Sequence, residues 1–163
     1  MRIFSHVDEL ATAVGERLGH SQWHTVDHNR VIQFAAATGD HQWIHVNPER
    51  AAQGPFGRTI AHGYLTLAMI PMLVGEIYRV ENVSMGINYG SNKVRFVSPV
   101  PVDSTVRAGA ELVSVTPGPA GVQVVVHVTV EMAGSDRPAC VAETVSVLVP
   151  ARTDSTALTG RKQ

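Results

Sequence analysis

The second half of the chain alternates between apolar and polar residues with a period of two. The pattern begins near residue 83 and is clearest over 106–112, 122–132 and 141–149. This period is typical of strands that face the core on one side and solvent on the other. Two turn-forming segments, at 117–121 and 134–138, separate the runs and contain glycine and proline. Short turns between such runs predict antiparallel hairpins.

The first half of the chain is predicted to be mainly helical. Residues 62–78 are apolar nearly all round a helix, which is typical of a helix inside a protein, and Pro71 should kink it. Residues 7–18 have apolar positions near helical spacing and predict a helix that Gly19 ends. Residues 23–26 predict a short strand.

Cap residues define two further helices. Asp27 is placed to cap the start of a helix that Gly39 ends. Residues 40–46 predict an irregular, non-helical loop. Asn47 followed by proline then predicts a second, short helix through residue 53, and 54–57 predicts a turn.

Helices and strands are segregated along the chain, which argues against a doubly wound parallel fold. We expect an α+β domain over residues 1–150, in which an antiparallel sheet wraps around a long central helix. The polar tail at 151–163 is predicted to be disordered.

Composition narrows the classes of partner. The formal charge is −1 and the pI is about 6.7 over 163 residues, which gives no electrostatic reason to expect nucleic acid or a membrane surface as partner. The N-terminus lacks a secretory h-region and no apolar run reaches the roughly 18 residues of a membrane span, so a cytoplasmic location is expected. The single cysteine, Cys140, excludes a disulfide within the chain and is expected to be a buried structural residue rather than a reactive thiol.

Asp40 and His45 are the first candidates for chemistry. A carboxylate and an imidazole held together can activate a water molecule and return its proton elsewhere. From spacing alone the pair is weak, because an Asp after a glycine is often a turn residue and a histidine is often packed for structural reasons.

His62 and Gly63, at the start of the predicted buried helix, are the second candidates. The first N–H groups of a helix have no internal partner, and a glycine there lets a ligand approach the backbone. The pair is therefore a plausible oxyanion and substrate-binding site. The alternative is that His62 is a poor cap and Gly63 a packing glycine.

Residues 87–96 are the third candidates. Asn88 and Asn92 flank a glycine and offer amides to a substrate, while Lys93 and Arg95 offer charges to a phosphate. A strand with a glycine bulge and solvated basic residues is the alternative. The eight histidines form no Cys/His cluster, and none of their His-x-x-x-His spacings lies within a predicted helix, so no metal site is expected.

Two of these motifs together resemble a known family. The stretch from Phe34 to Asp40-His-Gln-Trp-Ile-His45-Val-Asn-Pro resembles the signature of the MaoC-like (R)-specific enoyl-CoA hydratases, and Ile-Ala-His62-Gly63-Tyr-Leu resembles their entry into the central helix. The spacing of the two blocks also agrees. The NodN-like branch is the most similar in appearance, and the resemblance covers about residues 20–149.

The resemblance implies a hotdog fold and assigns roles. It places the catalytic water on Asp40 and His45 and the oxyanion donor on the N–H of Gly63, and it implies a homodimer and no metal or redox cofactor. The chain departs from the family where Asn-Pro is usual, because Gln42 and Trp43 stand there and are expected to form a wall of the acyl pocket. A serine that assists in some hydratases corresponds to Pro71.

The expected activity is reversible hydration of trans-2-enoyl thioesters to (R)-3-hydroxyacyl thioesters, with coenzyme A or an acyl carrier as part of the substrate. Three alternatives stay open from the sequence. These are a hotdog acyl-CoA thioesterase, a non-catalytic acyl-thioester binding protein, and a dehydratase that acts on carrier-protein thioesters in lipid synthesis.

Overall fold

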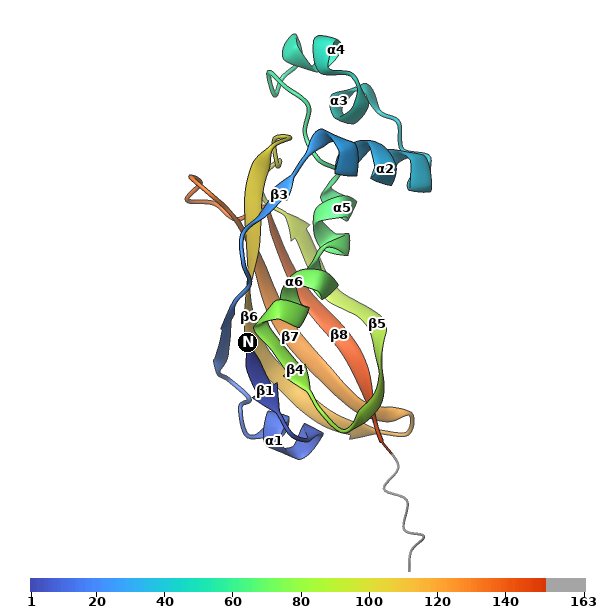
Figure 1. The fold of residues 1–163 in the computed structure, drawn as a ribbon, viewed down its shortest axis with the longest axis vertical. Helices are drawn as coiled ribbons and strands as arrows, with labels where there is room; N and C mark the ends of the chain where they lie inside the picture. Colours follow the sequence, from blue (N-terminus) through green and yellow to red (C-terminus); the bar gives the residue numbers. More distant parts are fainter. Residues whose placement is uncertain (152–163) are drawn as a thin grey trace, which may run out of the picture.

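A computed structural model describes residues 1–151, and the fold is a long antiparallel sheet with a helix across one face (Figure 1). The sheet order is β2-β6-β7-β8-β5, and β3 also pairs with β6. A separate pair, β1 with β4, is parallel. The strands are β1 Arg2–Phe4, β2 Arg17–His20, β3 His24–Val26, β4 Tyr78–Val80, β5 Val83–Phe96, β6 Ser104–Gly118, β7 Gly121–Met132 and β8 Cys140–Pro150.

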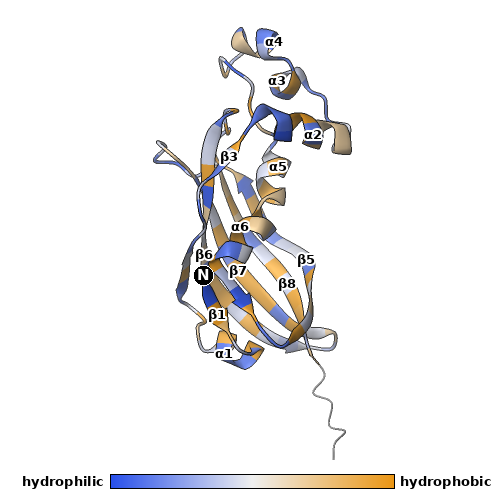
Figure 2. Cartoon of the chain, in the orientation of Figure 1, coloured by the Kyte–Doolittle hydropathy of each residue, from blue (hydrophilic) through white to orange (hydrophobic). Residues whose placement is uncertain are grey.

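The strands confirm the period-two pattern of the sequence. Along β7, Val126, Val128 and Val130 are buried in the same core cluster as apolar residues of the central helix, and hydrophobic residues recur along the strands (Figure 2). The β6–β7 hairpin closes at 118–121, as the turn residues predict. The strands therefore form the floor of the core, and the helix lies on that floor.

The central helix is two helices rather than one kinked helix. α5 (Gly63–Ala68) ends at Met69, and α6 (Ile70–Ile77) restarts there with Pro71 in its first turn. A proline in a first turn costs no hydrogen bond, which explains the restart. The prediction of burial all round is wrong for the described chain, because Tyr64 is 70% exposed and Met72 is 42% exposed.

The caps predicted for the next two helices are confirmed. α2 (His28–Thr38) begins after Asp27, whose side chain accepts a hydrogen bond from the N–H of Arg30, and it ends at Gly39 in the left-handed conformation. α4 (Pro48–Ala52) begins after Asn47, whose side chain accepts from the N–H of Arg50. Both helices stand beyond one end of the sheet, near the start of α5 (Figure 1).

Two predicted elements differ from the structure. The helix expected over 7–18 is only α1 (Val7–Ala11), because Gly15 turns the chain with φ 88° and β2 then pairs with β6. The loop expected over 40–46 contains a single helical turn, α3 (Trp43–Val46). Neighbouring segments decide both cases, since β2 forms only beside β6.

Residue 151 is the last described, so the prediction for the polar tail concerns residues that lie outside the described range. Within residues 1–151, no helix is both long enough and apolar enough to cross a bilayer.

Candidate active site

Asp40 lies where the chain leaves α2. Gly39 adopts φ 78°, which ends the helix, and the main-chain carbonyl of Asp40 then lies 3.0 Å from Nε2 of His62, the residue before α5. The carboxylate is 55% exposed and accepts one long hydrogen bond from the N–H of Gln42, at 3.4 Å. Asp40 therefore makes the kind of contact expected of a turn residue after a glycine, while most of its carboxylate stays available to a ligand.

His45 is held in one orientation by the segment before α5. Its side chain is 6% exposed, and its Nδ1–H donates to the carbonyl of Ile60 at 2.7 Å. The N–H of Ile60 donates to the carbonyl of Ile44 at 3.0 Å, which fixes the same segment to α3. Nε2 of His45 is then the free nitrogen, with its lone pair available to accept a proton.

The electrostatics keep His45 neutral. Burial lowers its pKa from the ordinary value of 6.5, and the nearby His62 lowers the pKa further, while the bond to Ile60 and the charge of Asp40 oppose the shift. A neutral imidazole with a free Nε2 is suited to a general base at physiological pH.

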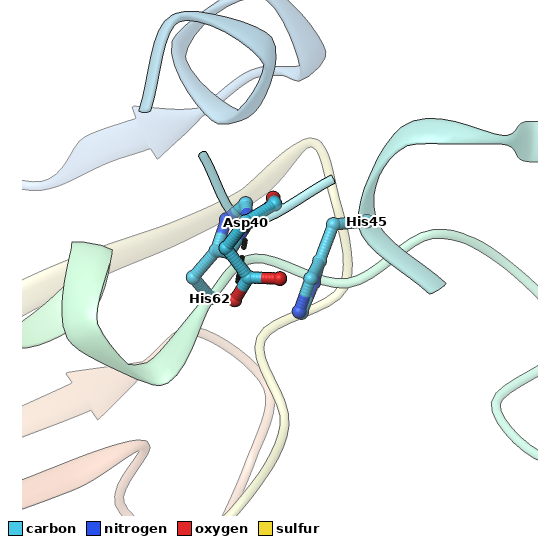
Figure 3. Close-up of side chains that lie close together, drawn as sticks. All are labelled: Asp40, His45 and His62. Atoms are coloured by element: carbon cyan, nitrogen blue, oxygen red, sulfur yellow. Dashed lines mark hydrogen bonds and ion pairs between the residues drawn. The ribbon is translucent and has the colours of Figure 1, made fainter. Parts of the chain in front are cut away.

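His62 joins the pair. Its Nε2–H donates to the main-chain carbonyl of Asp40 at 3.0 Å, and its ring stacks on His45 with centroids 3.8 Å apart (Figure 3). The ring of Phe34 packs against it at 5.0 Å. With 2% of its surface exposed, His62 offers little surface to a substrate from this position. Its substrate-binding role stays a prediction.

Asp40, His45 and His62 form the one group in the described residues whose ligand atoms lie within 4.8 Å of one another. Metal ligands require lone pairs aimed at one point about 2 Å away. Nε2 of His62 donates to the main-chain carbonyl of Asp40, and it is this nitrogen that lies 4.0 Å from the Asp40 carboxylate. It therefore has no lone pair for an ion shared with that carboxylate, which argues against a three-ligand metal site through this nitrogen.

Gly63 is the first residue of α5, so its N–H has no acceptor inside the helix. A Cβ at this position would lie 2.8 Å from the ring of Phe96, which is closer than side chains pack. Glycine is therefore required here for packing, and the same bare backbone is open to a ligand oxygen. Both readings of Gly63 from the sequence are compatible with this geometry.

The side chains of the remaining predicted residues are not members of this cluster. Asn92 donates to Glu143 at 2.6 Å, and Asn88 lines a cavity beside the central helix. The expected wall of Gln42 and Trp43 is not among the residues that line this cavity. Gln42 is exposed, and Trp43 packs under Gly54 and beneath the guanidinium of Arg50.

A cavity of about 920 Å³ lies between the central helix and the sheet. Its walls are mainly apolar, and Phe34 belongs to them while also packing on His62, so one aromatic ring joins the cavity to the cluster. Phe34 is the first residue of the stretch that resembles the family signature, and that resemblance alone gives no role for it. The other walls come from α5, α6 and the inner face of β5, β7 and β8, including Leu67, Ile70, Val74, Val126, Thr144 and Leu148.

The strand order and the helix on the sheet define a hotdog-type fold, and solved structures agree. A monoamine oxidase regulatory protein from Archaeoglobus fulgidus superposes with a TM-score of 0.73, at 24% identity over 93% of this chain and 97% of that chain. An R-hydratase from Pseudomonas aeruginosa superposes with a TM-score of 0.68, at 20% identity over 92% of each chain.

Sequence comparison identifies the family. The MaoC like domain matches residues 9–133. The chain is 57% identical to 3-hydroxyacyl-thioester dehydratase Z of Mycobacterium tuberculosis over 89% of this chain and 97% of the relative. It is 42% identical to Nodulation protein N of Rhizobium leguminosarum bv. viciae over 86% of this chain and 89% of the relative. The protein belongs to the MaoC-like dehydratase family, and the predicted hotdog fold is confirmed.

Proposed function

We propose that this protein is a hydro-lyase that reversibly hydrates trans-2-enoyl thioesters to (R)-3-hydroxyacyl thioesters. One observation carries the proposal: an exposed carboxylate, Asp40, and the free Nε2 of a neutral, fixed imidazole, His45, belong to one cluster. Relatives named as dehydratases of 3-hydroxyacyl thioesters support the same chemistry.

Water is the nucleophile in the hydration direction. It is held between the Asp40 carboxylate and Nε2 of His45, and its oxygen attacks C3 as one of its protons passes to this pair. The electrons of the double bond move onto the thioester oxygen, and the pair returns a proton to C2. Every atom of the added water is then in the product, so the reaction needs no metal or redox cofactor.

The thioester oxygen becomes negative during this reaction and needs a donor. The N–H of Gly63 is the donor we assign, because it begins α5 directly beside His62. A donor in this role is typically worth about 3 kcal/mol of transition-state stabilisation. The acyl chain is assigned to the cavity beside the helix, whose walls are mainly apolar.

The test is hydration of crotonyl-CoA, followed by loss of the enoyl absorbance. Asp40→Asn and His45→Ala should each lower kcat at least about 100-fold, because each removes a proton-transfer group. His41→Ala is the matched control, since His41 is an exposed neighbour of Asp40 and should leave the rate unchanged. Variants of Asp40 and His45 that fold and remain as active as wild type would rule out this site.

The same assay separates the alternative functions. A thioesterase would release free thiol, which a thiol-reactive dye detects, whereas hydration releases none. A binding protein would bind acyl-CoA without turnover at any chain length. Parallel rates on CoA and acyl-carrier-protein thioesters would show which carrier is used.

A homodimer is the assembly we propose. β5 is a 14-residue strand at the edge of the sheet, and its exposed side chains include Met85, Ile87 and Tyr89. A long apolar edge has unpaired backbone groups and tends to pair with another strand. A second copy related by a two-fold axis can present the same edge, so that the unpaired backbone groups of the two β5 strands bond to each other. The cytoplasmic location stays a prediction.

A further inference from the structure

His62 contacts both members of the catalytic pair and yet is almost inaccessible. It holds the main chain at Asp40 through Nε2–H and supports the ring of His45 by stacking. The other face of the cluster is closed by Phe34. One buried imidazole therefore connects the carboxylate, the base and the wall of the cavity.

We propose that His62 is a positioning residue for the hydration reaction, acting through Asp40 and His45 and not by contact with the substrate. Its hydrogen bond fixes where Asp40 leaves α2, and its ring fixes the plane of the His45 imidazole. This inference rests on the proposed function. The substrate-binding role expected from the sequence is the alternative that the experiments below test.

The buried nitrogen of His62 argues against a purely structural role. Within residues 1–151, Nδ1 of His62 is buried and has no hydrogen-bond partner. A buried acceptor without a partner costs free energy, and a phenyl ring would fill the same space without that cost. His62 also makes no side-chain cap bond to α5 in this part of the chain. A phenyl ring would avoid this cost but leave the carbonyl of Asp40 without its donor, so the imidazole is explained by the hydrogen bond to Asp40 and not by filling the space.

Two substitutions separate the hydrogen bond from the stacking. His62→Phe keeps a ring against His45 but removes the donor to Asp40, while His62→Gln keeps a donor near Nε2 and removes the ring. Both should fold. We expect kcat on crotonyl-CoA to fall between about 10- and 100-fold in each, with KM changed less than about twofold, because misplacement of reacting groups affects the chemical step.

A double-mutant cycle tests whether His62 acts through Asp40. In an Asp40→Asn background, His62→Phe should lower kcat less than about twofold, because the group it positions is already gone. Losses that multiply in full would overturn the inference, as would a His62→Phe variant as active as wild type. His41→Phe is the matched control, because it places the same ring at the exposed neighbour of Asp40.

The failure of this inference is distinguishable from failure of the proposed function. If wild-type protein hydrates no enoyl-CoA, the function is wrong, and NMR of the ¹⁵N-labelled imidazoles still tests the geometry. We expect neutral His62 to be protonated on Nε2 and neutral His45 on Nδ1, as their carbonyl partners require. The opposite tautomer at His62 would overturn the hydrogen bond to Asp40 and the inference with it.

Discussion

The contact between Gly63 and Phe96 gives a prediction whose size follows from the structure. In Gly63→Ala, the new Cβ would lie 2.8 Å from Cγ and Cδ2 of Phe96, whereas ordinary contact begins at 3.4 Å. The ring must therefore retreat by about 0.6 Å (3.4 − 2.8). Overpacking of this kind costs about 1–3 kcal/mol. Phe96 is 45% exposed and can move toward solvent, which favours the lower half of that range.

The companion variant Phe96→Ala removes the obstacle. With the ring gone, the three atoms nearest to the new Cβ are removed, and alanine gains helix propensity over glycine, worth up to about 1 kcal/mol. Gly63→Ala should therefore destabilise the wild-type background and be neutral or stabilising in the Phe96→Ala background. The coupling free energy between the two positions should be about 1–3 kcal/mol.

Guanidinium unfolding at one fixed protein concentration, followed by the fluorescence of the two tryptophans, measures these free energies. A cost of 1–2 kcal/mol corresponds to a fall in Tm of roughly 2–8 °C for a domain of this size. If Gly63→Ala costs the same with and without the phenyl ring, the contact with Phe96 is not the reason for glycine here. Gly63→Ala retains the main-chain N–H at position 63. If Gly63→Ala lowers turnover and the added Phe96→Ala substitution restores it, that loss of turnover also comes from packing.

Two further predictions concern pH and assembly. Because burial lowers the pKa of His45 below 6.5, with His62 adding to the shift and Asp40 opposing it, activity should be lost as pH falls through a value below 6.5. The folded state then binds fewer protons than the unfolded chain, so the unfolding free energy should also fall as pH drops below 6.5. If the midpoint of the acidic limb of the pH–rate profile lies above pH 7, the assignment of His45 as the base is contradicted. Wild-type protein should sediment as a dimer and Ile87→Glu as a monomer, because a charge on an edge strand opposes pairing. Val113→Glu, at an exposed site on β6, should leave the dimer intact, and a monomeric wild type would refute the assembly.

Several local elements could be predicted from the sequence because their causes are local. Asp27 and Gly39 bracket α2 through hydrogen bonds and a backbone conformation that involve only nearby residues. The alternation along β7 reports which side of a pleated strand is buried, whatever its neighbours are. Asp40 and His45 were identified by their place in a motif, and their chemistry could be named before their geometry was known.

Other features depended on segments far apart in the chain. Residues 17–20 form a strand because β6 lies beside them, although the helix expected over 7–18 included the first two of these residues. Trp43 was expected at the acyl pocket, but the absence of a side chain at Gly54 leaves room for its ring there. The pairing of a strand and the packing of a ring depend on which distant segments come together in the fold, and short-range sequence patterns carry no information about those contacts.

For the candidate site, the sequence and the tertiary structure likewise determine different properties. The sequence by itself determined which groups are available: a carboxylate at 40, imidazoles at 45 and 62, and a glycine at 63. Only the tertiary structure decided their roles, because His45 is oriented by the carbonyl of Ile60 and His62 is buried against the carbonyl of Asp40. A hydrogen bond across 15 or 22 residues is fixed by packing of the whole domain, and these two bonds are the basis for proposing one histidine as the base and the other as its support.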